Sequence, residues 1–330
     1  MADRSQLTAG RLALTFLGLA ALVALVWAGC TMLGRYDLTP QVWRFRAVRV
    51  FAAGLIGLAL ASGGLALQGL VRNPLAEPYI LGISSGAGVG VLMGRAMALD
   101  AFFPRWLSEP ALAAVGGLAT CFVVWGIAQR RGRLDPFVLL LAGVIVNVFN
   151  GALILVLFLF ASPDDIASFV GWGMGQVPDW LITQPGLAWS STAIVLAGWV
   201  FLLLRGSAFN ALGMGDTVAA SLGVPVHRLR IETFVVVSLM TAAAVAIAGP
   251  VGFVGLIVPH ACRLIFGPDH RVLVVVAGLL GAIFVMLADT ACRTVGEWVG
   301  LAEIPVGVLT ALAGGPFFIL LLRRRFQGMP

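Results

Sequence analysis

Residues 50–90 read VFAAGLIGLALASGGLALQGLVRNPLAEPYILGISSGAGVG, and this stretch decides the fold class. Its first part, residues 50–70, carries no charge and matches the roughly 20 apolar residues that a helix needs to cross a bilayer. Two prolines and an asparagine within residues 72–78 then end that helix and turn the chain. The stretch therefore predicts a membrane-spanning helix, a defined turn and a second segment rich in glycine and serine.

Small residues recur along the first helix of this stretch. They allow helices to approach closely in lipid, where no hydrophobic driving force brings helices together. We expect close helix–helix contacts at Gly54, Gly57, Ala61, Gly63 and Gly64.

The rest of the chain repeats the pattern of long apolar runs and short polar links. Of the 330 residues 60% are hydrophobic and 11% are charged, whereas soluble proteins are roughly 25% charged. The sequence therefore predicts an all-α polytopic membrane protein, a single domain over residues 1–330 with about ten transmembrane helices. The apolar segments are residues 12–33, 50–70, 79–99, 110–128, 137–161, 187–204, 231–249, 253–266, 272–294 and 304–322.

Two of these segments need separate treatment. The first is preceded by Arg4 and Arg11 but is followed by no clear cleavage site, so we interpret it as a retained helix. The eighth is too short to span alone, follows Gly249-Pro250 and contains Pro259. We expect a broken or partly re-entrant helix there, sheltered by protein.

The distribution of arginine predicts the orientation. All 21 basic residues are arginine, and two thirds of them fall on one side if both termini are cytoplasmic. Because cytoplasmic loops carry the excess of basic residues, we expect the N- and C-termini in the cytoplasm. Residues 35–49 are the exception, since four arginines crowd into this outer segment. Either an acidic partner binds there or the charges are simply solvated, and position alone does not separate the two.

Short motifs follow one another along nearly the whole chain. Besides Asn-Pro-Leu-Ala-Glu-Pro at 73–78, they are Arg46-Ala47-Val48-Arg49, Ser62-Gly63 with Gln68, Leu141-Ala142-Gly143, Leu222-Gly223, the run from Gly252 to His260, Asp269-His270-Arg271, Asp289 with Arg293, and Pro305-Val306-Gly307 through Gly315-Pro316-Phe317. In this order they resemble the FecCD-type permeases, the membrane subunits of type II ABC importers for iron-siderophores, heme and vitamin B12.

This resemblance implies a function and a set of partners. The permeases form homodimers with a pathway along the dimer axis, bind two ATPase subunits at the cytoplasmic face and receive substrate from a periplasmic binding protein. The expected function is import of an iron chelate, a siderophore or heme, from periplasm to cytoplasm across the bacterial inner membrane; cobalamin is the alternative. The sequence has no phosphate-cradling loop. We therefore expect no enzymatic activity and no cofactor in this chain, with ATP and Mg on the partner ATPase, and no nucleic-acid partner.

Three arginines are candidates for docking the binding protein. Arg46 and Arg49 are three residues apart, so a helix would place them on one face. The resemblance aligns them and Arg293 with arginines that receive acidic residues of the binding protein. Anchoring to lipid headgroups is the alternative. Asp289 precedes Arg293 by four residues, and we expect these two to pair along their helix.

The resemblance also implies an inner gate made of two turns. Asn73 and Leu75 belong to the first turn, and Asp135, Pro136 and Phe137 to the second. The second turn departs from the small hydroxyl residues of the B12-transporting members, which weighs against cobalamin.

Two asparagines on the fifth predicted helix leave their role open. Asn147 and Asn150 are three residues apart and share a face. They line the pathway or bond to neighbouring helices.

The longest inner loop, residues 205–230, is the candidate ATPase contact. Asp216 is placed to cap a short helix, and Gly223 with Pro225 to stop it. An apolar helix outside the membrane needs a partner, and the resemblance identifies this segment as the coupling helix. The residues expected to take part are Leu212, Gly215, Asp216, Ala219, Leu222 and Gly223.

Two other functional classes fit the sequence less well. A secondary transporter usually places carboxylates near midplane, and only Asp289 qualifies. An intramembrane enzyme needs a nucleophile with a base, and no such set is evident. The residues His227, His260 and His270 are far apart, so no metal site is expected. The four cysteines read as packing residues.

Overall fold

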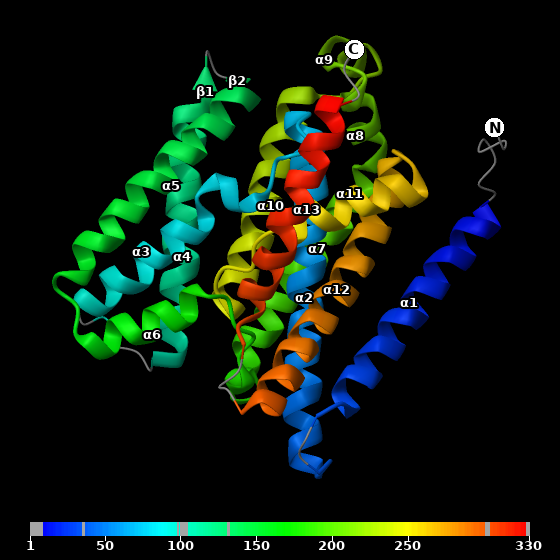
Figure 1. The fold of residues 1–330 in the computed structure, drawn as a ribbon. Coiled ribbons are helices and arrows are strands. Elements are labelled where there is room, and N and C mark those ends of the chain that lie inside the picture. The colour runs from blue at the N-terminus through cyan, green and yellow to red at the C-terminus, as the bar shows by residue number, and fades with distance from the viewer. Residues whose placement is uncertain are drawn as a thin grey trace.

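The computed structural model describes residues 9–34, 37–97, 99, 105–130, 133–300 and 304–327 and is a helical bundle (Figure 1). Its α-helices are α1 (Ala9–Met32), α2 (Pro40–Val71), α3 (Ile83–Ala96), α4 (Arg105–Ala128), α5 (Pro136–Phe158), α6 (Pro163–Gly173), α7 (Pro185–Leu204), α8 (Gly206–Gly213), α9 (Asp216–Ser221), α10 (Val226–Ala248), α11 (Val254–Phe266), α12 (His270–Val299) and α13 (Val306–Gln327). Two 3₁₀ turns, η1 (Pro78–Leu81) and η3 (Asp179–Thr183), and a two-residue antiparallel pair, β1 (Gln129–Arg130) with β2 (Arg133–Leu134), complete the described chain.

The all-α membrane fold is confirmed. Each of the ten predicted apolar segments contains a helix, and seven described helices are long and apolar enough to cross a membrane. α11 is shorter, as expected for the eighth segment. It begins after the non-helical link from Gly249 to Phe253, where Phe253 has a left-handed φ of 66°, and Pro259 lies inside it.

Local sequence explains where several helices begin. Proline occupies the first helical position of α2, α5, α6 and α7, where its missing N–H costs no hydrogen bond. Thr39 and Ser162 cap two of these helices by accepting hydrogen bonds from Val42 N and Asp165 N.

α2 runs through the centre of the bundle and contacts α1, α7, α10, α11 and α12. Its small residues permit this. A Cβ atom at Gly57 would overlap the carbonyl oxygen of Gly281 on α12, and one at Gly64 would overlap Gly255 on α11. The predicted close approach at these glycines is confirmed.

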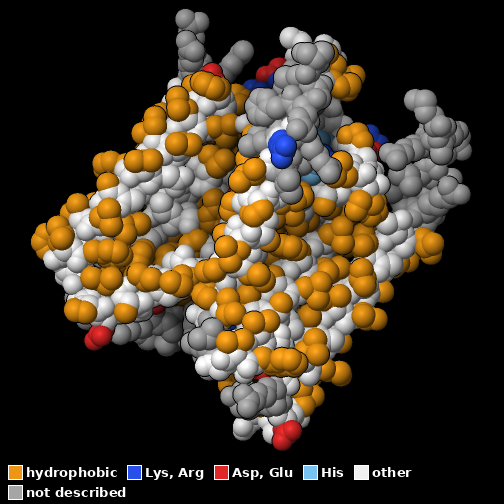
Figure 2. Space-filling model, viewed as in Figure 1, with side chains coloured by type: hydrophobic (Ala, Val, Ile, Leu, Met, Phe, Trp, Pro, Cys, Tyr) orange, Lys and Arg blue, Asp and Glu red, His pale blue; other side chains and the backbone are white. Residues whose placement is uncertain are grey.

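The ends of the helices agree with an even number of crossings. α1 begins and α13 ends at the same end of the bundle, which also carries α8 and α9, whereas α6 lies toward the other end (Figure 1). Hydrophobic side chains cover the broad middle of the face seen in Figure 2, and the charged side chains gather toward its two ends. This distribution suits a bilayer around the middle. The cytoplasmic placement of the termini remains a prediction.

Candidate functional site

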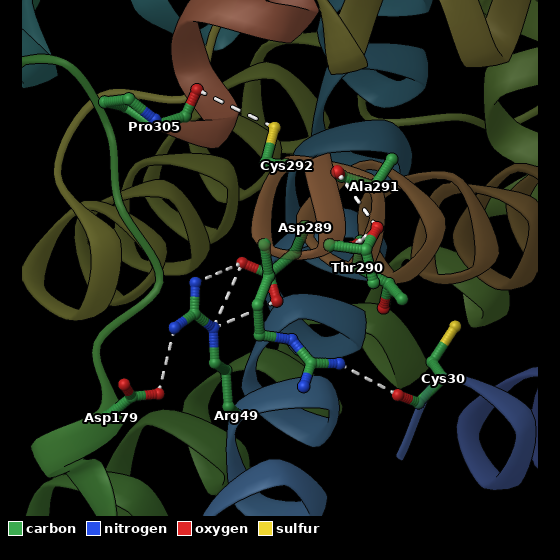
Figure 3. Close-up of polar contacts among 10 residues, drawn as sticks. Cys30, Arg49, Asp179, Asp289, Thr290, Ala291, Cys292 and Pro305 are labelled. Atoms are coloured by element: carbon green, nitrogen blue, oxygen red, sulfur yellow. Dashed lines mark hydrogen bonds and ion pairs between the residues drawn. The ribbon is translucent and has the colours of Figure 1, made fainter. Parts of the chain in front are cut away.

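A buried ion-pair cluster joins three segments near the end of the molecule where α2 begins (Figure 3). Arg49 on α2 donates from Nη2 to Oδ1 of Asp289 on α12 at 3.0 Å, and from Nε to both carboxylate oxygens at 3.3 and 3.1 Å. Its Nη1 donates to Oδ1 of Asp179 in η3 at 3.0 Å. Arg49 is 2% exposed and Asp289 1%. The bidentate bond therefore fixes α2 and α12 relative to each other away from water, and the single bond to Asp179, whose side chain is 55% exposed, adds η3 at the solvated edge.

This cluster changes the expected pairing of Asp289. Sequence spacing favoured Arg293 on the same helix, but the carboxylate receives Arg49 from another helix. Arg293 instead donates from Nη2 to the carbonyl oxygen of Cys30 at 3.0 Å. Its Nε and Nη1 are buried and have no hydrogen-bond partner among the described residues.

The three predicted docking arginines lie beneath the surface of the isolated chain. Arg46 and Arg293 are each 6% exposed. The Arg46 guanidinium lies against Gly34 so closely that a Cβ atom there would overlap it. The sequence predicts these arginines as a docking site for the binding protein, and in the isolated chain their charges lie together at one buried place. A role of Arg49 in docking would have to compete with its bonds to Asp289 and Asp179.

At the opposite end, the turn after α2 is built from local hydrogen bonds. Arg72 has a left-handed φ of 51° and its N–H donates to the carbonyl of Gln68. Asn73 N donates to the same carbonyl at 3.2 Å, and Asn73 Oδ1 accepts from Leu75 N at 3.0 Å. The asparagine side chain therefore fixes the turn, as residues of this type do.

The second predicted turn is a helix cap. Asp135 Oδ1 accepts from Phe137 N at 2.9 Å and from Val138 N at 3.2 Å, and Pro136 takes the first helical position of α5. Phe137 is 75% exposed. A ring on this face of a membrane-spanning helix is available to a neighbouring protein.

The two turns line one open cleft of about 920 Å³. Asn73 comes from the first turn, and Asp135, Pro136 and Phe137 from the second. The structure thus brings four of the five predicted gate residues together; Leu75 is half-buried and outside the lining. The full lining is Val71, Arg72, Asn73, Leu134, Asp135, Pro136, Phe137, Leu140, Asp216 and Arg230.

The predicted coupling segment contains two short helices, α8 and α9, instead of one. Gly215, with a φ of 121°, precedes α9, and Gly223, with a φ of 82°, follows it. Asp216 is the first residue of α9, and its side chain makes no cap. The carboxylate instead pairs with Arg72 and Arg230.

The outward face of this segment differs from the predicted one. Leu212 and Ala219 are fully buried within the chain. With no exposed surface, these two residues cannot contact a partner protein. They pack the segment against the rest of the chain. Leu222 is exposed, together with Met214 and Val218, which the sequence analysis did not single out. Val218 on α9 and Leu222 directly after it are four residues apart and share one side of that helix, whereas Met214 ends α8 before the break at Gly215. We call Val218 and Leu222 the α9 apolar face.

The two asparagines of α5 act as bonds between helices. Asn147 Nδ2 donates to the carbonyls of Tyr79 and Ile80 at 3.2 and 3.3 Å, and its Oδ1 accepts from Ser85 at 2.6 Å. Asn150 is buried and donates to Ser85 and Thr120. Both therefore hold α5 against η1, α3 and α4.

Only Asn147 of this pair also lines a recess. The recess measures about 500 Å³ and lies between α3, α5, α6 and the link after α10. The Phe169 and Trp172 rings lie 5.6 Å apart within its wall. No lining residue is charged; they are Tyr79, Ile80, Ser84, Ser85, Gly88, Asn147, Ile154, Phe169, Trp172, Gly173 and Pro250.

Among the residues that the structure describes, no group of three or more His, Cys, Asp or Glu side chains is placed to hold a metal ion. His260 lies edge-on to the ring of Phe317, and His270 packs against Phe209 and contacts Asn210. These histidines are therefore accounted for by packing and hydrogen bonding.

Known proteins share both the sequence and the fold. The profile of the FecCD transport family matches residues 11–324. The cobalamin import system permease of Halobacterium salinarum is 40% identical over 288 residues, covering 86% of this chain and 73% of that protein. The hemin transport system permease of Yersinia pestis is 37% identical over 295 residues, covering 88% and 86%. A solved inward-facing ABC transporter of the metal-chelate type superposes with a TM-score of 0.81 at 28% identity, covering 94% of this chain and 99% of that one. The chain belongs to the FecCD transport family and is an ABC importer permease of the metal-chelate, heme and vitamin B12 type.

Proposed function

We propose that this permease carries an iron chelate, with heme as the leading substrate, from the periplasm to the cytoplasm. The observation that supports this choice is the uncharged recess beside Asn147, with Phe169 and Trp172 in its wall. Trp172 is partly exposed there, whereas Phe169 is buried within the wall beside it, and a flat conjugated macrocycle packs well on an accessible aromatic ring. Heme carries its anionic groups at one edge of an otherwise apolar ring, whereas a siderophore rich in anionic oxygens would need positive charge that these lining residues do not supply.

Cobalamin is the second candidate. It is also a tetrapyrrole-like metal complex, and a cobalamin permease is among the similar proteins. The aromatic recess suits both ring systems. The Asp135-Pro136-Phe137 turn, which lacks the small hydroxyl residues associated with B12 members, favours heme.

The proposed working unit contains two copies of the chain, two ATPase subunits and a periplasmic binding protein, in the bacterial inner membrane. α5 supports the dimer, because Phe137, Val144 and Val148 are all at least half exposed along it. Such a face either meets lipid or a second copy, and an axial pathway requires the second copy. The cleft at Asn73 and Asp135 is proposed as the cytoplasmic gate.

Uptake by proteoliposomes tests the substrate. The permease, reconstituted with its ATPase and binding-protein subunits, is supplied with ATP and with hemin, a ferric siderophore or cyanocobalamin in turn. We expect ATP-dependent accumulation of hemin. Transport of cyanocobalamin alone would establish the second candidate, and transport of the siderophore alone would overturn the argument from the recess.

A matched pair of variants tests the recess itself. Ser84→Asp places a carboxylate among the uncharged lining residues and should slow uptake by opposing the anionic side groups of heme. Ser190→Asp makes the same change on the exposed side of α7 and should leave uptake intact. Equal uptake by the two variants would show that the recess is not part of the transport pathway.

A further inference from the structure

Asp216 joins the coupling segment to the turn of the proposed gate. Its carboxylate forms an ion pair with Arg72, the last residue before Asn73. It also accepts hydrogen bonds from Nη2 of Arg230 on α10, at 3.0 Å to either oxygen. One side chain of α9 therefore contacts both the end of α2 and the start of α10.

Nothing flexible separates Arg72 from the gate turn. Arg72 sits in the left-handed region, with φ at 51°, and the N–H groups of Arg72 and Asn73 both donate to Gln68 O. A residue held in this conformation cannot rotate far without breaking the turn. Any displacement of the Arg72 backbone is therefore shared by Asn73, and the ion pair with Asp216 is the contact through which α9 can pull on that backbone once the Arg72 side chain is extended.

The Asp216 carboxylate is available for this contact because it does not cap α9. An aspartate at the start of a helix commonly caps it, but α9 has no side-chain cap. The helix has only 6 residues and depends on its neighbours for position. Its attachment to α2 and α10 through Asp216 is thus a substantial part of what places it.

The strength of the contact suits a reversible link. The side chains of Arg72 and Asp216 are 41% and 44% exposed, so this pair contributes little to stability. The Arg230 side chain is far more buried, with only 11% of its surface exposed. Asp216 therefore has one shielded partner on α10 and one solvated partner at the gate turn, and the solvated one is the easier to exchange during movement.

We propose that Asp216 is the positioning residue through which movement of α9 reaches the Asn73 turn, Arg72 being its partner there and Arg230 its anchor. This inference rests on the proposed function, because it requires α9 to follow the ATPase and the Asn73 turn to act as the gate.

The test uses a reporter that needs no substrate. Leu75→Cys is introduced into the complete transporter, because the substitution keeps the backbone N–H of residue 75 that bonds to Asn73 Oδ1, and its reaction with a maleimide is followed with and without ATP. The native cysteines are all buried, so the introduced thiol is the accessible one. With Asp216 intact, we expect reactivity to change with nucleotide. With Asp216→Asn, we expect that change to shrink by roughly tenfold, within the range of coupling between two sites, while the ATPase still copurifies.

Two further variants separate a link from a merely structural contact. Asp216→Glu keeps a negative charge toward both Arg72 and Arg230 and should recover part of the response that Asp216→Asn loses. Arg228→Gln removes another cytoplasmic ion pair, Arg228 with Glu232 at 2.6 Å, and should leave the response unchanged.

The outcomes distinguish this inference from the proposed function. An Asp216→Asn transporter with the full nucleotide response, or one that loses its ATPase, overturns the link. A reporter that ignores nucleotide even with Asp216 present overturns both the gate and the link. Failure to transport any chelate would count against the proposed substrate alone, because the reporter works without one.

Discussion

The carboxylate of Asp289 on α12 lies against the guanidinium of Arg49 on α2, with Oδ1 3.0 Å from Nη2 and Oδ2 3.1 Å from Nε. The two residues are 240 positions apart in the sequence. Because both side chains are buried, water cannot solvate either charge if the other residue is removed. The pair therefore binds the central helix to α12 and makes each residue depend on the other.

We expect Asp289→Ala to destabilise the protein strongly. Loss of one member of a buried pair costs about 3–5 kcal/mol, and we expect the lower part of this range here because Arg49 keeps its bond to Asp179. Arg49→Met combined with Asp289→Leu should cost less than Asp289→Ala alone. Thermal unfolding in detergent measures both, with the exposed Asp164→Asn as control. Equal Tm values for Asp289→Ala and the control would contradict the role of the pair.

The tight contact between α2 and α12 gives a second prediction. Gly57→Val should lower the Tm, because the added side chain meets the backbone of Gly281, which cannot rotate away. Gly18→Val on α1 is the matched control, since a Cβ atom there meets nothing within 4 Å. A Gly57→Val protein as stable as the Gly18→Val protein would show that the helices separate easily.

Hydropathy was sufficient to predict the long helices, and the reason is physical. A membrane-spanning helix needs a run of apolar residues whatever its neighbours are. α6 and α8 were missed because an 11-residue and an 8-residue helix need no such run. The broken segment around Phe253 was predicted because Gly249, Pro250 and Pro259 restrict the backbone locally.

The sequence located the candidate sites as stretches of the chain, but it did not show which side chains contact one another. Motifs located the gate turns, and the turns do meet in one cleft. Spacing along one helix, however, paired Asp289 with Arg293 and carried no information on Arg49. The orientation of α9 was equally hidden, because a 6-residue helix takes its orientation from tertiary packing. Ala219 is thus buried where an outward residue was expected.

The third prediction concerns the α9 apolar face. Val218→Asp with Leu222→Asp should release the ATPase on purification, because both side chains are exposed and an apolar groove would have to desolvate the new charges. The dimer should persist. Thr217→Asp, an exposed change on the same helix, should retain the ATPase.

Ala219 is unsuitable for that test. It is 0% exposed, so a charge there would disturb the fold of the chain and confuse misfolding with lost docking. If the Val218→Asp, Leu222→Asp protein still copurifies with its ATPase in normal amounts, the α9 apolar face is not the contact.

The last prediction concerns docking of the binding protein at Arg46 and Arg293. Both residues lie at the end of the molecule that is predicted to face the periplasm, where the positive-inside bias makes arginine scarce. Arg293 also has two buried N–H-bearing atoms without a hydrogen-bond partner in the described chain. Both atoms lie beneath the surface, so docking would have to open the outer end before a carboxylate of the binding protein could satisfy them with strong, charge-assisted hydrogen bonds. Arg49 is less suited to the test, because its substitution would also break the bonds to Asp289 and Asp179.

Glutamine is the appropriate replacement, because a glutamate at either site would add negative charge beside Asp289. We expect Arg46→Gln with Arg293→Gln to weaken binding of the purified binding protein by roughly tenfold or more at low salt, as loss of close charge pairs does. The difference should narrow at high salt, where screening weakens the pairs of the unaltered protein. Arg44→Gln, an exposed change on α2, should have little effect. ATPase copurification should persist, and the Tm of the double variant reports separately on loss of the buried bond from Arg293 to the carbonyl of Cys30. Normal binding by the double variant at low salt would show that the binding protein docks elsewhere and that these arginines serve the fold of the outer end alone.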